Sequence, residues 1–162
     1  LALARLEAQG RLAAVVTQNI DGLHQQAGSR TVHELHGSAL RNFCIGCMAR
    51  YDLDYIMNPA NCGGDGLVPR CPKCGAIVRP DVVLYEEGLS QAVMTAAVRA
   101  IEAADVLIVG GTSLAVYPAA GLLQYFNGDR LVLINLSETP YDGQADLVIR
   151  RPLGQALAEA VG

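Results

Sequence analysis

The fold class is set by the stretch Leu12-Ala13-Ala14-Val15-Val16-Thr17-Gln18-Asn19-Ile20-Asp21-Gly22. Residues 12–17 form a short apolar run with β-branched side chains, which is typical of a strand buried on both faces. An amide, a carboxylate and a glycine turn follow this run directly. Such polar groups at the end of a buried strand are what a ligand-binding edge of a sheet requires.

Along the rest of the chain, apolar patterns typical of strands alternate with apolar patterns typical of helices. We expect helices at 1–9, 91–104, 118–126 and 153–161, and strands at 81–84, 106–109, 131–134 and 145–149, with 106–109 and 131–134 buried. This alternation predicts an α/β fold with a doubly wound, parallel, Rossmann-like sheet. Polar or glycine-rich groups follow three of the strands: Gln18-Asn19, Gly111-Thr112-Ser113 and Asn135.

The composition limits the possible functions. The chain has 162 residues, a formal charge of −4 and no dense Lys/Arg run, so we expect one domain with a small insertion and no nucleic-acid partner. Its apolar runs are too short to span a bilayer, and no signal peptide is visible, so we expect no membrane partner. The chain starts in a helical pattern without Met, and we expect further sequence upstream.

Two Cys-x-x-Cys pairs, Cys44/Cys47 and Cys71/Cys74, predict one structural zinc. Four thiolates fill a tetrahedral site and leave no position open for chemistry. The alternative is two buried or redox-active thiol pairs. Cys62 lies in a glycine-rich turn at 61–66 and is expected to be a bystander. This cysteine usage fits a reducing compartment, and we expect a cytoplasmic protein with a zinc-ribbon module at 38–79.

Two other motifs are weaker. Gly110-Gly111-Thr112-Ser113 resembles a phosphate- or ribose-binding turn, although a plain strand-to-helix turn would look similar, and no GxGxxG loop is present. His33 and His36 are three residues apart, which is the wrong spacing for a metalloprotease helix. His36, before Gly37, is a candidate general base, with an ordinary surface or core histidine as the alternative. His24 is expected to be structural.

Taken together, these motifs resemble those of the sirtuin family, the NAD-dependent protein-lysine deacylases. The resemblance covers the carboxyl-terminal two-thirds of the family's catalytic core and lacks the amino-terminal glycine-rich loop. The sheet should therefore be incomplete at its amino terminus, and this chain alone is expected to be a poor enzyme. The matching motifs are residues 17–24, Ala27-Gly28, His36-Gly37, the two cysteine pairs, residues 79–83, residues 111–114 and Ile134-Asn135.

The resemblance implies a role for each motif. NAD would be the cosubstrate and His36 the base that takes a proton from a ribose hydroxyl, with Asn19 and Asp21 also in the catalytic set. The NAD contacts would come from Gln18, Asn19, Ile20, Asp21, Gly111, Thr112, Ser113 and Asn135. An acyl-lysine peptide would add as a strand between residues 83–87 and 115–117. Its contacts would come from Val83, Leu84, Tyr85, Glu86 and Val116.

The resemblance implies removal of acyl, most often acetyl, groups from lysine, giving nicotinamide and O-acyl-ADP-ribose. Residues 1–37 and 80–162 would form the NAD-binding part. Protein ADP-ribosylation and a catalytically inactive zinc- and nucleotide-binding module remain as alternatives. One departure from the family is Tyr85-Glu86-Glu87, where the family has an aromatic residue, glycine and glutamate. The extra carboxylate could favour basic peptides or simply be solvated.

Overall fold

The computed structural model describes residues 1–64 and 66–162, so Asp65 of the expected turn at 61–66 lies outside the described residues. The α-helices are α1 (Ala2–Ala8), α2 (Leu23–Gln26), α3 (Leu53–Met57), α4 (Gln91–Glu102) and α5 (Leu153–Val161), and the 3-10 helices are η1 (Pro59–Asn61), η2 (Ala119–Tyr125) and η3 (Asp142–Gln144). The strands are β1 (Val15–Thr17), β2 (Val32–Glu34), β3 (Gly37–Cys44), β4 (Arg50–Tyr51), β5 (Val78–Val82), β6 (Val106–Gly110), β7 (Arg130–Ile134) and β8 (Leu147–Ile149).

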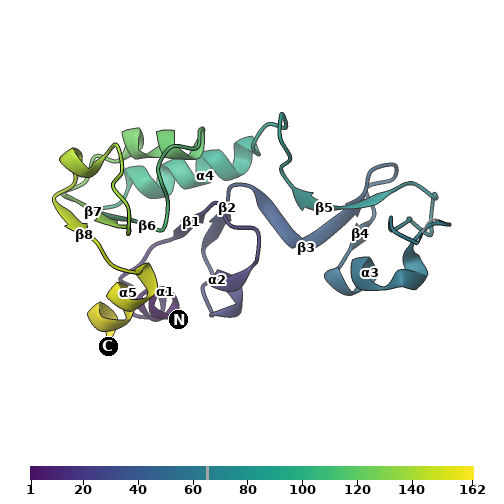
Figure 1. Ribbon diagram of the computed structural model, residues 1–162, viewed down its shortest axis with the longest axis horizontal. Helices are drawn as coiled ribbons and strands as arrows, with labels where there is room; N and C mark the ends of the chain where they lie inside the picture. Colours follow the sequence, from purple (N-terminus) through teal and green to yellow (C-terminus); the bar gives the residue numbers. More distant parts are fainter. Residues whose placement is uncertain (65) are drawn as a thin grey trace.

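Parallel pairing confirms the α/β class, and it occurs in two separate sheets. β1 pairs with β2, while β7 lies between β6 and β8. β3 instead pairs antiparallel with both β4 and β5. Figure 1 shows this antiparallel sheet, with α3, at one end of the molecule, and β6–β8, α1 and α5 at the other. Within the described residues no helix has the length and apolar character needed to cross a bilayer.

Apolar residues from separate elements form the core around the parallel strands. Leu35, just after β2, packs with Ala97 and Ile101 of α4 and with Leu122 of η2. On β7, Leu133 is 1 % exposed and is the centre of a second cluster. α5 and α1 pack together next to Ile134. The first and the last residues of the chain therefore lie on the same side of the sheet (Figure 1).

Three predicted elements differ from those in the structure. The helix expected at 118–126 is a 3-10 helix, because Ala119 and Leu122, three residues apart, both face the α4 cluster and so fit a repeat of three residues per turn. The strand expected at 81–84 is β5, which is shifted to Val78–Val82 by its pairing with β3.

The third difference concerns β6, which the sequence predicts to be buried. Val106 is 52 % and Ile108 41 % exposed, because β6 is the edge strand of its three-stranded sheet and alternate side chains point away from the packed face. The expected burial is correct for β7, the central strand.

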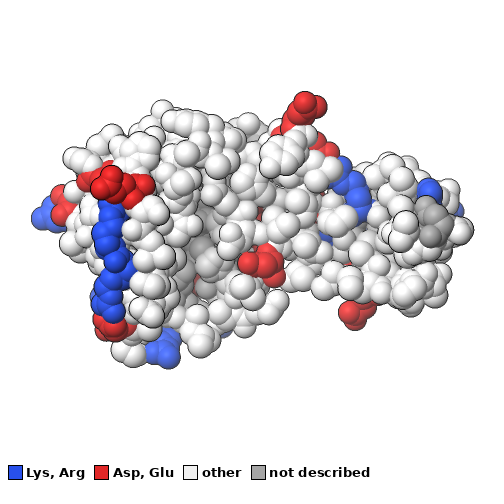
Figure 2. All heavy atoms as spheres, in the orientation of Figure 1, with Lys and Arg blue, Asp and Glu red and all other residues white. Residues whose placement is uncertain are grey.

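Charged side chains are distributed without one dominant sign. Figure 2 shows small groups of basic and acidic side chains separated by wide uncharged surface. Several are ion pairs, such as Arg150 with Asp142 and Arg151 with Glu159.

Gly37 gives a test of the close contact between β3 and β5. Its φ is +78°, and a Cβ there would lie 2.0 Å from the Asp81 carbonyl oxygen. We expect Gly37→Ala to lower the free energy of unfolding by about 2 kcal/mol or more, because both the backbone conformation and the contact become strained. Urea unfolding measures this. Gly154→Ala is the control: it lies in α5 with open space around it. It should be neutral or slightly stabilising, and equal effects of the two changes would contradict the argument.

Candidate functional site

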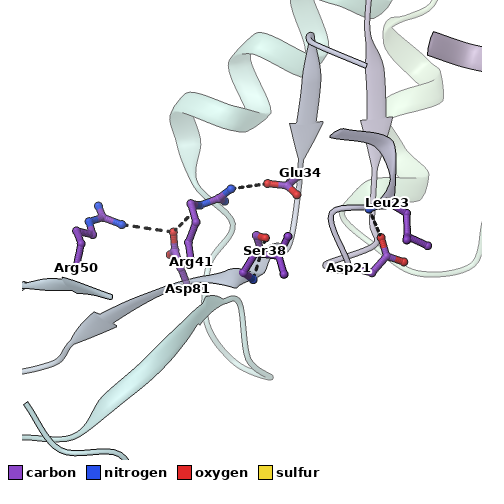
Figure 3. Close-up of polar contacts among 8 residues, drawn as sticks. Asp21, Leu23, Glu34, Ser38, Arg41, Arg50 and Asp81 are labelled. Atoms are coloured by element: carbon purple, nitrogen blue, oxygen red, sulfur yellow. Dashed lines mark hydrogen bonds and ion pairs between the residues drawn. The ribbon is translucent and has the colours of Figure 1, made fainter. Parts of the chain in front are cut away.

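The polar segment after β1 is held in a fixed turn by its own side chains. The Asn19 N–H donates to Thr17 Oγ1 at 3.1 Å, and the Leu23 N–H donates to Asp21 Oδ1 at 3.0 Å (Figure 3). The Ala39 N–H of β3 donates to the Ile20 carbonyl at 2.9 Å. The segment therefore extends beyond the end of β1, and β3 holds it through the Ile20 carbonyl. Asn19 and Asp21 are exposed, whereas Gln18 and Ile20 are half-buried.

His36 lies beside this segment, in the two-residue turn between β2 and β3. Its Nδ1 is 3.0 Å from the Gln18 carbonyl oxygen. Because a carbonyl only accepts hydrogen bonds, Nδ1 must carry the proton in this contact. The neutral ring then has a free lone pair on Nε2, which is the form that a general base requires.

The backbone of the same turn joins the neighbouring segments. The Leu35 N–H donates to the Thr17 carbonyl at 2.9 Å, and the Val83 N–H donates to the His36 carbonyl at 3.0 Å. His36 therefore contacts the end of β1 through its ring and the segment after β5 through its backbone. The structure brings together the candidate residues 18–21, His36 and Val83.

A buried carboxylate on β2, two residues before His36 in the chain, was not predicted from the sequence. Glu34 of β2 is 8 % exposed and receives a hydrogen bond from Arg41 Nη1 at 2.6 Å. Asp81 of β5 also contacts Arg41, at 3.4 Å, and Arg50, at 3.7 Å (Figure 3). Burial opposes the charge of Arg41, but its bonds to Glu34 and Asp81 outweigh that effect and raise its pKa. This network joins β2, β3 and β5 around the turn.

A groove of about 300 Å³ lies next to this network and extends to the segment after β5. Arg79 on one side of it binds Glu87 through two hydrogen bonds, of 2.7 and 3.0 Å. The bond from Arg79, with a further one from the Leu84 N–H, lowers the pKa of Glu87 to about 2. The segment from Val83 to Glu87 is thus fixed at both ends. No spacing rule pairs residues 79 and 87, so this contact has no signal in the local sequence pattern.

Glu86 has an unusual backbone conformation, with a φ of +72°. Glu86 lies at the position where the sirtuin pattern has glycine. A left-handed conformation that suits glycine is therefore adopted here by a residue that has a Cβ. The neighbouring Tyr85 and Leu84 are exposed, as is Val116 on the other expected side of the peptide site. The described hydrogen bonds of Val116 run within its own segment, to Ala120, and do not join it to residues 83–86.

The other predicted ligand group gathers at the carboxyl ends of β6 and β7. Gly110 and Ile134 are partners in register, so Gly111-Thr112-Ser113 and Asn135 leave the same edge of the sheet. Gly111 has a φ of +66°, and Thr112 Oγ1 accepts from the Leu114 N–H at 3.2 Å. Asn135 Nδ2 donates to the Ser137 carbonyl at 3.0 Å. Each turn thus contains a hydrogen bond from one of its own side chains, and the two turns follow neighbouring strand ends, as the sequence predicts.

The four paired cysteines form one cluster. Their Sγ atoms all lie within 4.8 Å of one another, with Cys44–Cys74 at 3.3 Å and Cys47–Cys71 at 3.6 Å. Zinc–sulfur bonds of about 2.3 Å in a tetrahedron require sulfurs about 3.8 Å apart, so the cluster fits a zinc ion. Among the described residues Cys62 is outside this group.

The surroundings of the sulfurs favour the thiolate at Cys71 but not at Cys74. Burial raises the pKa of Cys71, but hydrogen bonds from Tyr51 and from the Lys73 and Cys74 N–H groups outweigh this effect and lower the pKa to about 6. The Ala76 N–H lowers the pKa of Cys74, but contacts with the Cys44 and Cys47 sulfurs outweigh it and raise that pKa to about 12. The Gly46 N–H donates to Cys44 Sγ at 3.3 Å. A zinc ion held by all four cysteines would have a closed coordination sphere and would serve the fold alone.

Comparison with known proteins shows the family to which the chain belongs. The structure is an α/β chain with His36 in the turn between β2 and β3, polar residues at the ends of parallel strands and a four-cysteine cluster. The Sir2 family model matches residues 1–118, and the chain belongs to the Sir2 family. It is 55 % identical over 159 residues to an NAD-dependent protein deacetylase of Clostridium acetobutylicum and 56 % identical over 162 residues to one of Clostridium perfringens.

The solved structures extend the comparison to the fold. A Sir2 structure described as bound to acetylated peptide matches with a TM-score of 0.91 and 37 % identity, and one described as a complex with p53 peptide and NAD+ with a TM-score of 0.90. Each match covers 98 % of this chain and 66 % of the other. The chain spans 63 % and 64 % of the length of the two clostridial relatives, covering 98 % and 99 % of its own.

The zinc assignment predicts one metal ion per chain. We expect Cys71→Ala to abolish stoichiometric zinc, because three thiolates leave the tetrahedron open, and metal removal to unfold residues 38–79. Elemental analysis and circular dichroism measure the two effects. Cys62→Ala is the control and should keep its zinc. Full zinc content in Cys71→Ala would show that the ligand set is wrong.

The conformation of Glu86 predicts the effect of restoring glycine. A left-handed conformation costs a residue with a Cβ about 1–2 kcal/mol, and glycine avoids this cost. We expect Glu86→Gly to unfold at higher urea concentration than Glu86→Ala, by about 1 kcal/mol in free energy. Both changes remove the carboxylate, so their difference reports the backbone alone. Equal stabilities would mean that residue 86 is not held in this conformation.

Proposed function

We propose that this chain supplies the catalytic base and part of the NAD site of an NAD-dependent protein-lysine deacylase. The reaction removes acyl groups, most often acetyl, from lysine and yields nicotinamide and O-acyl-ADP-ribose. The observation that carries the proposal is His36, whose Nδ1 is bound to the Gln18 carbonyl beside the Asn19–Asp21 turn. The named activity of the Clostridium relatives supports it.

The residues after β1 serve the nicotinamide end of NAD in this proposal. Gln18 and Asn19 hydrogen-bond the nicotinamide ribose, and Asp21 with the Ile20 backbone holds the carboxamide. The exposed side chains of Asn19 and Asp21, on a turn fixed by Thr17 and β3, are suited to this task. NAD bound there would supply an electrophilic ribose carbon for the oxygen of the acyl-lysine substrate.

His36 then accepts a proton at Nε2 from a ribose hydroxyl, which becomes the nucleophile toward the acyl carbon. The Gln18 carbonyl keeps the Nδ1 proton in place and stabilises the imidazolium that forms, as an acceptor behind a catalytic histidine does. At the other end of NAD, Gly111, Thr112, Ser113 and Asn135 contact phosphate and the adenine-side ribose. Their common position at the edge of β6 and β7 supports this assignment.

The substrate in this proposal is an acylated-lysine peptide that adds as a strand between residues 83–86 and Val116. Figure 1 shows the segment after β5 leading away from the antiparallel sheet toward α4. The Arg79–Glu87 contact would hold this segment ready for main-chain pairing. The matched Sir2 structures include complexes with acetylated and with propionylated peptides, which supports an acyl-lysine ligand.

We also infer the division of the chain and its location. Residues 1–37 and 80–162 form the NAD-binding part, and 38–79 the zinc module, with β3 and β5 crossing between them. The free cysteines fit a reducing compartment, which supports a cytoplasmic location.

The role of His36 is tested by substitution. The assay uses this chain fused to the part of the Clostridium perfringens relative that lies outside the match. We expect His36→Ala to lower deacylation of an acetyl-lysine peptide by roughly a hundredfold or more, since a positioned base is lost. NAD affinity should change much less. The measurements are nicotinamide release, O-acetyl-ADP-ribose formation and NAD binding.

His33→Ala and His24→Ala are the matched controls and should retain most of the activity. Near wild-type turnover in His36→Ala, with loss in either control, would assign the base to another histidine. Transfer of labelled ADP-ribose to protein without release of O-acetyl-ADP-ribose would instead support an ADP-ribosyltransferase.

A further inference from the structure

Tyr51, at the end of β4, contacts one of the four cysteines. Its hydroxyl oxygen lies 3.0 Å from Cys71 Sγ, although the two residues are 20 positions apart in the sequence. β4 pairs with β3, and Tyr51 is the register partner of Asn42 on that strand. Cys71 is only 2 % exposed, so water has little access to this sulfur. The Tyr51 phenol therefore lies next to a buried sulfur of the four-cysteine site.

Tyr55 keeps the Tyr51 ring in this position. The two ring centroids are 4.3 Å apart. Tyr55 is itself fixed at both ends, because its N–H donates to Asp52 Oδ1 at 2.9 Å and its hydroxyl donates to the Arg70 carbonyl at 2.7 Å. The Tyr55 hydroxyl thus binds the backbone of the residue before Cys71, while the Tyr51 hydroxyl contacts the Cys71 sulfur itself.

The direction of the Tyr51 contact follows from the chemistry of the site. A thiolate bound to a metal has no proton, so it can only accept, and the phenol must donate. Four thiolates around one Zn²⁺ leave a net charge of −2, and each donor to sulfur disperses part of it. Cys44 obtains such a bond from the Gly46 N–H, at 3.3 Å. Cys71, which is buried, obtains one from the Tyr51 side chain.

We propose that Tyr51 is a positioning residue of the metal centre, whose hydroxyl donates a hydrogen bond to the Cys71 thiolate and so retains the metal. The bond orients Cys71 for coordination and withdraws electron density from its sulfur. A less electron-rich thiolate reacts more slowly with oxidants and electrophiles. Because such a reaction at a ligand sulfur is the first step of metal loss, the metal is lost more slowly. This role rests on the four-cysteine site and does not depend on the deacylase reaction.

The test compares Tyr51→Phe with Tyr55→Phe in this chain, using Co²⁺ as a spectroscopic substitute and Zn²⁺ by competition. Both changes remove one hydroxyl and keep the two neighbouring rings. Loss of an outer-shell partner weakens metal binding by about 10–100-fold, so we expect at least a tenfold weaker affinity for Tyr51→Phe. Its sulfur-to-cobalt charge-transfer band should shift to lower energy, because the thiolate becomes a better electron donor. Tyr55→Phe leaves the phenol on Cys71, so its band should stay unshifted and its affinity should fall less than that of Tyr51→Phe.

Equal affinities and identical charge-transfer bands in wild type and Tyr51→Phe would overturn the proposal. An equal loss of affinity in both variants, with unshifted bands, would show that the tyrosines only support the fold. If Tyr51→Phe does not fold, the wild-type chain decides the question. With an NMR-active cadmium isotope in the site, a tyrosine hydroxyl proton should show scalar coupling to the metal through sulfur, and the absence of that coupling would refute the bond.

Discussion

His36 connects three segments that lie apart in the sequence. Its ring binds the Gln18 carbonyl after β1, and its own carbonyl receives the Val83 N–H after β5. The next residue, Gly37, lies so close to the Asp81 carbonyl that no side chain fits there. The candidate base, the turn at residues 18–21 and the start of the expected peptide segment are therefore positioned by one turn between β2 and β3.

The antiparallel sheet links this turn to the four-cysteine site. β3 begins at Gly37, directly after His36, and ends at Cys44. β5 runs back from Val78, beside the cysteines, to Val82, just before the Val83 contact with His36. Metal binding at one end of the sheet would therefore stabilise the strands that hold His36 at the other. The cluster can support the proposed reaction in this way without touching a substrate.

The buried carboxylate of Glu34 adds a second constraint on the turn. Moving a carboxylate out of water is costly, and removal of its partner would leave that cost uncompensated. Arg41 is this partner, and it also contacts Asp81 (Figure 3). The network thus favours one arrangement of β2, β3 and β5. Arg41 is half-exposed, so its role is better described as orienting the strands than as a large contribution to stability.

Sequence reasoning found the features that follow from local pattern. The helices α4 and α5 follow from apolar spacing, and the cysteine cluster follows from two tight pairs. The exposed face of β6 and the shift of β5 depend on which strands are neighbours, and no local pattern encodes this. The Arg41–Glu34 and Arg79–Glu87 pairs and the Tyr51–Cys71 contact likewise arise only when separate elements meet.

The central claim is that the Gln18 carbonyl holds His36 in the Nδ1-protonated form, with Nε2 free to accept a proton. Nitrogen NMR of the histidine-labelled chain measures the tautomer directly, and His36→Ala assigns the signal. We expect one slowly exchanging Nδ1–H and an unprotonated Nε2 for the neutral ring. A neutral ring with its proton on Nε2, or rapid averaging between the two tautomers, would contradict it.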